Sequence, residues 1–112
     1  MKLIKLFVLL FLLIASCKSN SEKEAKLKEA LSYLSEIQEI SWYEIEGNDI
    51  YIGFNKLPDD WRMIIKGAAL KGNEAINFGC HVWAVDANKK GWRPGDSSYY
   101  GEVTARYGKI EK

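Results

Sequence analysis

Cys80 and His81 are the first residues to consider for chemistry, because a thiol beside an imidazole is a familiar activated nucleophile. They lie within residues 76–86, where the residue pattern predicts a strand. Neighbouring side chains of a strand point to opposite faces, so these two groups cannot act on each other. Cys80 falls on the more apolar face, and we expect a buried structural thiol there. We expect His81 to be a hydrogen-bonded histidine on a half-exposed face.

Other signatures of catalysis or metal binding are missing from the sequence. His81 is the only histidine and the chain has two cysteines, which excludes a histidine-rich metal site and a cysteine zinc cluster. There is no GxSxG, HExxH, P-loop or dinucleotide fingerprint. The acidic pair Asp59-Asp60 is explained by a helix start. The sequence therefore predicts no catalytic residue, no metal ion and no cofactor.

A polar loop over residues 87–98 carries the main candidates for binding. Trp92 lies there among glycines, a proline and charged residues, where no apolar periodicity accounts for it. Tryptophan and arginine are the side chains most enriched in binding hot spots, and loops held by rigid strands commonly carry function. The alternative is that Trp92 folds back and caps one end of the core. The candidates in this loop are Lys90, Trp92, Arg93 and Asp96.

A second group of candidates extends this surface. Alternation along residues 76–86 and 99–107 places one set of side chains on the sheet face that helices are expected to leave open. These candidates are His81, Trp83, Tyr100 and Arg106, with Glu102 beside them. Loop and open face together would form one binding surface.

The start of the chain has the layout of an export signal. Lys2 and Lys5 precede an apolar run over residues 6–14, and the small residues Ala15-Ser16 follow. Nine apolar residues cover only about 13 Å as a helix, whereas a hydrocarbon core is about 30 Å thick. The run is therefore expected to be a signal peptide, residues 1–16, rather than a retained membrane anchor. A plain secretory signal is the other alternative.

The sequence Leu13-Ile14-Ala15-Ser16-Cys17 resembles the lipobox of bacterial lipoproteins. The resemblance implies that Cys17 becomes the new N-terminus and carries a diacylglycerol, usually with a further acyl chain. Two or more acyl chains anchor a protein stably without spanning the membrane. Lys18 at the next position favours the outer membrane if the cell is Gram-negative. Lipidation of Cys17 would also leave Cys80 without an intramolecular disulfide partner.

The mature chain is expected to be one small domain, residues 22–112, behind a lipidated cysteine and short tether at 17–21. From Lys18 to Ser21 the tether is four residues, which reach about 14 Å when fully extended. Removing Lys2 and Lys5 leaves 14 of the 16 basic residues against 15 acidic residues, a formal net charge of −1. Such a balance gives no electrostatic footprint for nucleic acid.

Apolar periodicity predicts two helices. The first runs from residue 22 to about residue 39, behind a capping box of Ser21 and Glu24. Its apolar stripe consists of Leu27, Leu31, Leu34 and Ile37. The second has Pro58 in its first turn and ends at Gly72-Asn73. Its stripe consists of Trp61, Ile64, Ile65, Ala68 and Ala69.

The remaining elements are strands, and together with the helices they predict an α+β domain. Strands are expected in a hairpin over residues 41–54 that turns at 47–49, over residues 76–86 and over residues 99–107, with 108–112 as a tail. The order α-β-β-α-β-β gives a four-stranded, mainly antiparallel sheet with two helices on one face. Moving the last strand to the front would give the split-βαβ order of ferredoxin-like domains. The element order also resembles the BON domain, a periplasmic module that is found on lipoproteins and linked to phospholipid binding.

Three hypotheses for function follow. The first is a non-catalytic binding module, anchored to the bacterial cell envelope through Cys17, that contacts a protein, glycan or lipid headgroup through the 87–98 loop and the open sheet face. The second is an immunity or phage-exclusion lipoprotein that binds one cognate protein. The third is an envelope enzyme, which would need an uncovered cleft at His81 with a partner carboxylate.

Overall fold

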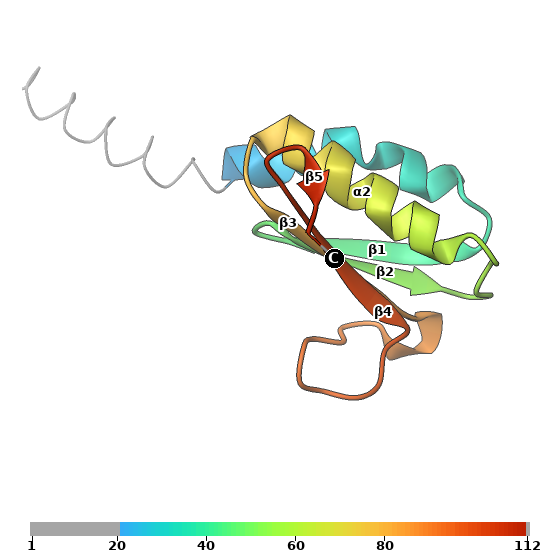
Figure 1. The fold of residues 1–112 in the computed structure, drawn as a ribbon. Coiled ribbons are helices and arrows are strands. Elements are labelled where there is room, and N and C mark those ends of the chain that lie inside the picture. The colour runs from blue at the N-terminus through green and yellow to red at the C-terminus, as the bar shows by residue number, and fades with distance from the viewer. Residues whose placement is uncertain (1–20, 112) are drawn as a thin grey trace, which may run out of the picture.

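The computed structural model describes residues 21–111, in which five strands form one mixed sheet with the helices on one of its faces (Figure 1). The signal peptide, Cys17 and the start of the tether lie outside the described residues. The strands are β1 (Ile40–Glu46), β2 (Asp49–Phe54), β3 (Cys80–Asp86), β4 (Gly101–Arg106) and β5 (Lys109–Ile110). The other labelled elements are the long helix α2 (Trp61–Ile76) and two 3-10 helices, η1 (Ser32–Glu36) and η2 (Ala87–Lys89).

The sheet order is β1-β2-β3-β4-β5. All neighbours are antiparallel except β2 and β3, which are parallel and joined through α2. The α+β class, the helices on one face and the mainly antiparallel pairing agree with the sequence prediction, whereas the sheet has five strands instead of four. Because β2 and β3 are adjacent, the βαβ unit is not split by another strand, which differs from the ferredoxin-like order.

The fifth strand arises from a tight turn, at a place where the residue pattern predicts one continuous strand and a tail. Tyr107 and Gly108 have φ angles of 55° and 72°, and Arg106 pairs with Lys109 across them. Positive φ at both central residues is the geometry of a type I′ hairpin turn. Glycine at the second position permits this turn, but tyrosine is an unusual residue for the first.

The first helix is shorter and less regular than predicted. Residues 21–30 are α-helical, and the chain then tightens into η1 instead of continuing as α-helix to residue 39. The expected capping box is replaced by a tertiary contact, because the carboxylate of Glu24 accepts a hydrogen bond from the backbone N–H of Gly47 at 3.0 Å. Glu24 thereby ties the helix to the turn between β1 and β2.

Helix α2 continues past the predicted stop at Gly72-Asn73 and ends at Asn77, which adopts the left-handed conformation with φ 55°. Gly72 serves packing rather than termination. A Cβ atom there would lie 3.0 Å from both the Cys80 sulfur and a Leu27 methyl. Asn73 is buried, and its amide donates to the carbonyl of Phe78 at 2.7 Å. Gly72 therefore lets α2 pack closely against β3 and the helix of residues 21–30, and Asn73 ties α2 to the segment before β3.

The main core lies between the helices and the sheet. Its fully buried side chains come from every layer, as the alternation and the helical stripes predict. They include Leu27, Leu31, Leu34, Ile50, Ile52, Phe54, Cys80 and Val82. The prediction was wrong for Phe78: the strand begins at Cys80, and the Phe78 side chain is 55% exposed.

Candidate functional site

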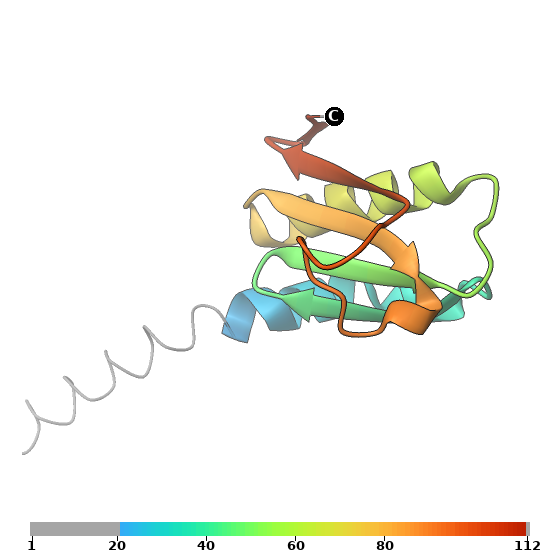
Figure 2. The same ribbon diagram turned by 90° about the horizontal axis from the view of Figure 1, so that it is seen from below.

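The sheet face opposite the helices is not open, because the loop over residues 87–98 folds across it (Figures 1 and 2). Trp92 is 3% exposed and packs with Tyr51, Trp83 and Val85 in a second apolar cluster. Two alternatives were considered for Trp92, an exposed binding residue and a residue that folds back onto the protein. The structure shows the second. Its position differs from the expected one, since the indole covers the middle of a sheet face rather than one end of the core.

The second cluster is built as a row of rings across β2, β3 and the loop. The His81 ring stacks on Trp83 with 3.7 Å between ring centres, and Trp83 stacks on Tyr51 at 5.1 Å. Trp92 makes an edge contact with Tyr51 at 6.1 Å and lies tilted against Tyr99 at 5.2 Å. Such offset and edge contacts contribute about 0.5–1.5 kcal/mol each beyond the area they bury. Trp83, predicted to lie on an open face, is therefore buried in this packing, whereas His81 is partly exposed at its edge, as the half-exposed position predicts.

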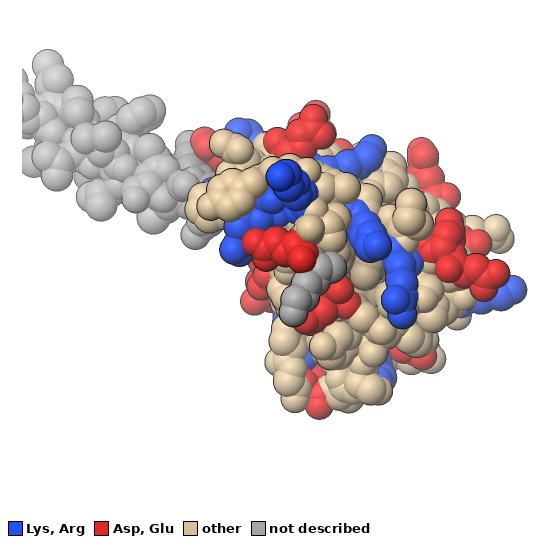
Figure 3. All heavy atoms as spheres, viewed as in Figure 1, with Lys and Arg blue, Asp and Glu red and all other residues tan. Residues whose placement is uncertain are grey.

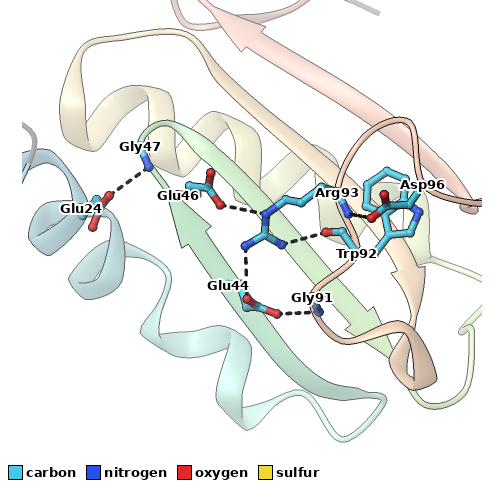
Figure 4. A network of polar contacts seen from close by, with 8 residues as sticks. All are labelled: Glu24, Glu44, Glu46, Gly47, Gly91, Trp92, Arg93 and Asp96. Carbon is cyan, nitrogen blue, oxygen red and sulfur yellow. Dashed lines mark hydrogen bonds and ion pairs between the residues drawn. The ribbon is translucent and has the colours of Figure 1, made fainter.

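Arg93 fastens the loop to strand β1 (Figure 4). Its Nε donates to the Glu46 carboxylate at 2.8 Å, and its Nη2 lies 3.5 Å from Glu44. The guanidinium also lies over the Tyr51 ring, 4.4 Å from the ring centre. The Glu44 carboxylate accepts a second bond from the backbone N–H of Gly91 at 3.2 Å. We call this group of Arg93, Glu44, Glu46 and Gly91 the loop latch.

Hydrogen bonds within the loop fix the rest of its course. The Trp92 indole N–H donates to the carbonyl of Ser97 at 2.9 Å, and the Asp96 carboxylate accepts from the backbone N–H of Arg93 at 2.8 Å. Lys89 donates to the carbonyl of Ser98 at 2.8 Å. Lys90 and the segment from residue 94 to residue 100 remain exposed on the outside. The loop is thus fixed on its inner side and accessible on its outer side.

His81 has a carboxylate neighbour at the edge of the aromatic row. Its Nε2 lies 3.6 Å from Glu102, and both side chains are partly exposed beside a shallow hollow of about 190 Å³ that Thr104 and Glu111 also line. Asp49 pairs with His81 in register, and burial raises the pKa of Asp49 while the imidazole opposes that rise. A carboxylate next to an imidazole orients the ring.

Cys80 cannot complete a catalytic pair with His81. Its sulfur lies on the helix side of the sheet, fully buried against Gly72. Burial, reinforced by the negative charge of Asp49, raises the pKa of the thiol to about 11. Since the thiolate is the nucleophilic form, this environment makes the thiol inert at neutral pH.

Tyr100 and Arg106 lie away from the aromatic row and at opposite ends of β4. Tyr100 contacts Trp61 of α2, with 6.4 Å between ring centres, beside a groove of about 290 Å³. Arg62, Lys66 and Glu102 also line this groove. Trp61, which helical periodicity assigns to the core, packs against the edge of the main core as a partly buried residue. Its indole also covers Gly101, where a Cβ atom would lie 2.7 Å from the ring. Arg106 lies at the far end and pairs with Glu111 at 3.3 Å.

The eight candidates therefore divide among four places. Trp92, Trp83, His81 and Arg93 lie at the covered sheet face, and Lys90 and Asp96 are exposed on the loop. Tyr100 and Arg106 border two separate hollows. Trp42 and Tyr51, which were not among the candidates, complete the covered face. The sequence signal that could have identified Tyr51 is its alternation with Ile50 and Ile52, which puts its side chain on the other face of the strand. Trp42 packs flat on Gly53 and donates to the carbonyl of Ala87 at 2.7 Å.

Residues 21–111 contain no helix that has the length and apolarity needed to cross a membrane. In the same residues, no group of three or more His, Cys, Asp or Glu side chains is arranged to hold a metal ion. Comparisons of the chain with protein-family models, with curated proteins and with solved structures give no match.

Proposed function

We propose that this protein is a lipid-anchored lipoprotein of the bacterial envelope that binds a partner protein through the outer side of the 87–98 loop. It has no catalytic role in this proposal. Cys17 carries the lipid, and the domain follows directly behind it. The exposed end of the loop, with Tyr100 and the neighbouring groove, forms the contact surface.

The observation that carries this proposal is the composition and support of residues 95–100. This exposed segment reads Gly-Asp-Ser-Ser-Tyr-Tyr. Tyrosine, serine and glycine dominate antibody binding loops, because tyrosine offers a large amphipathic contact area and the small residues adapt their hydrogen bonds. Here the segment is held from beneath by Trp92 and the loop latch. A rigid support reduces the entropy lost on binding.

The covered sheet face also supports binding through the outer side of the loop, although the sequence suggested that this face itself would bind. Two buried tryptophans, Trp83 and Trp92, serve to fix the loop and are not themselves available to a partner. The aromatic groups that segment 95–100 leaves on the outside are Tyr99, 44% exposed, and Tyr100, 41% exposed. They replace Trp92 as the expected anchors of the interface.

Lipidation is tested separately from binding. The full chain is expressed in bacteria with an alkyne-bearing fatty acid, and labelling and the intact mass are compared with those of Cys17→Ser. We expect label and the mass of the acyl groups on the wild type and neither on the variant. A wild type that is secreted without label would contradict the lipoprotein assignment while leaving the binding loop untouched.

Binding is tested by photo-crosslinking in the intact envelope of the source bacterium. A benzophenone amino acid at Ser97, on the loop, is compared with one at Lys28, which is exposed on the helix of residues 21–30. We expect a discrete crosslinked protein band from position 97 that weakens when Tyr100→Ala is added, and no such band from position 28. Equal bands from both positions, or none from position 97, would refute the loop as the contact surface.

A further inference from the structure

Two aromatic side chains are exposed at the end of the sheet where β3 begins and β4 ends. Phe78 is 55% exposed and Tyr107 is 89% exposed. They flank a hollow of about 490 Å³ that Asn48, Asn77 and Arg106 also line. We call this region, with Phe78, Arg106 and Tyr107, the turn end.

The folding of the chain does not account for either ring. Tyr107 has a φ of 55° at a turn position where glycine or asparagine is preferred, and its side chain is almost fully in solvent. Phe78 follows the left-handed residue Asn77 and lies outside the core, between the end of α2 and the start of β3. Large exposed apolar groups that lie close together mark contact sites for another molecule.

The turn end is also a well-fixed surface, because its turns are joined by hydrogen bonds. Asn48 donates to the carbonyl of Gly79 at 2.6 Å, which links the β1–β2 turn to the start of β3. The carbonyl oxygen of the Asn73 side chain accepts from Gly108 at 2.8 Å, which links α2 to the last turn. The backbone that carries both rings is therefore held in place by the fold.

The described chain begins at this same end, with the helix of residues 21–30 (Figures 1 and 2). The Lys23 ammonium lies over the Phe78 ring, 3.9 Å from its centre, and Glu24 binds the β1–β2 turn. Ser21 is thus within one helical turn of a residue that touches Phe78. If Cys17 is lipidated, the four residues that follow it reach at most about 14 Å, so this end lies close to the membrane surface.

From these observations we propose that the turn end rests in the headgroup layer of the membrane to which Cys17 is attached, with Phe78 and Tyr107 inserted among the lipids. This inference rests on the lipid anchor of the proposed function. Aromatic side chains are favoured at the membrane–water interface because they have an apolar body, and tyrosine adds a polar tip. Lys23 and Arg106 flank the two rings and can meet lipid phosphates.

Charge alone does not explain this contact. Arg106 is paired with Glu111, and on the face seen in Figure 3 basic and acidic side chains are interspersed. The aromatic rings therefore supply most of the attraction. The orientation also has a consequence for binding: the groove at Trp61 and Tyr100 lies at the opposite end of β4, so it would face away from the membrane.

A depth measurement on the lipidated protein tests the proposal. Single cysteines are introduced as F78C, Y107C and, as a control, M63C, and each is labelled with a polarity-sensitive fluorophore. Cys17 is blocked by lipid and Cys80 is buried, so each variant has one reactive thiol. Met63 is 69% exposed near the start of α2, at the end of the helix remote from Asn77. The proteins are reconstituted in vesicles of phosphatidylethanolamine and phosphatidylglycerol that contain lipids spin-labelled near the headgroup.

We expect a blue shift and quenching of the fluorophore at positions 78 and 107 and neither at position 63. Equal signals at positions 107 and 63 in a protein whose acylation is verified by mass would overturn the proposed orientation and leave the anchor intact. Failure of the wild type to acquire lipid would instead refute the anchor. In that case the orientation is refuted as well, because the vesicle contact depends on the anchor.

Discussion

The Arg93 Nε lies 2.8 Å from the Glu46 carboxylate and joins a loop to a strand that are 47 residues apart in the chain. The same guanidinium lies over the Tyr51 ring. One side chain therefore holds the loop both by charge and by contact with the aromatic row. The loop has no strand pairing of its own between η2 and β4, so this contact and the buried Trp92 determine its course.

Replacing Arg93 is expected to loosen the loop without unfolding the domain. The ion pair with Glu46 is largely exposed and contributes little, and the cation–π contact with Tyr51 contributes a similar small amount. Arg93→Ala should therefore lower the free energy of unfolding by about 1 kcal/mol. Urea denaturation followed by circular dichroism measures the change. Lys90→Ala, at an exposed position of the same loop, should leave stability unchanged; an equal loss in both variants would contradict the role of the latch.

Trp92 is expected to contribute far more than Arg93 to the free energy of unfolding, because it is the buried anchor of the loop. Trp92→Ala removes a large ring from the second cluster and should cost about 3–5 kcal/mol. Trp92→Phe should cost less, since one aromatic ring remains and the losses are part of the indole's volume and its hydrogen bond to Ser97. Limited trypsin digestion should cleave the alanine variant after Lys89 or Lys90 before the rest of the domain. Unchanged protease resistance of the loop would show that Trp92 is not its anchor.

Two glycines of α2 should respond oppositely to alanine. No atom lies within 4 Å of the position that a Cβ would occupy at Gly67, so Gly67→Ala should stabilise the helix by about 0.5–1 kcal/mol. At Gly72 the Cβ would crowd the Cys80 sulfur and a Leu27 methyl at 3.0 Å. Gly72→Ala should therefore destabilise by about 1 kcal/mol, after the helical gain is deducted from the cost of overpacking. Thermal or urea unfolding of the pair provides the comparison, and a stabilising Gly72→Ala would refute the packing role.

The sequence predicted those parts of the fold that depend on periodicity. The helical stripe from Leu27 to Leu34 and the alternation of Ile50, Ile52 and Phe54 both identify the main core correctly. The end of α2 could not be predicted from periodicity. Gly72 signals either a helix stop or close packing, and only the position of Cys80 in space distinguishes the two.

The candidate site was harder to predict because a loop has no period. Trp92 and Arg93 were singled out as binding residues, whereas in the structure they fix the loop, and their partners Tyr51 and Glu46 lie about 40 residues earlier in the sequence or more. Nothing local to the loop indicates whether it covers a face or projects from it. Tyr107 illustrates the reverse case: the Tyr-Gly pair is a weak hairpin signal, so the residue pattern predicts a strand end where the chain in fact turns back.

The thiol of Cys80 should be unreactive in the native protein and should make stability fall at high pH. Burial and the charge of Asp49 raise its pKa from the ordinary 9.0 to about 11 in the folded state. The unfolded chain loses this proton near pH 9, whereas the folded chain keeps it, so the free energy of unfolding falls as pH rises from about 9 to 11.

In a Cys17→Ser background, Cys80 is the only thiol, and a thiol reagent should label it slowly without denaturant and rapidly in urea. Burial also raises the pKa of Tyr33 and Tyr51, so the slope from Cys80 is isolated by comparison with Cys80→Ala. The two proteins should converge in stability as pH rises. Fast labelling of the native protein would show that the thiol is accessible.

Tyr107→Asn should raise stability while weakening the proposed membrane contact. Asparagine adopts a left-handed conformation more readily than tyrosine, and Asn-Gly is the preferred pair for a type I′ turn, so we expect a gain of about 1 kcal/mol in the free energy of unfolding. Tyr107→Phe keeps the ring and should change neither property. In the vesicle assay, the blue shift of the fluorophore at position 78 should shrink in Tyr107→Asn and persist in Tyr107→Phe. A loss of stability in Tyr107→Asn would mean that the ring contributes to the fold, and the argument that it is exposed for contact with lipid would then fail.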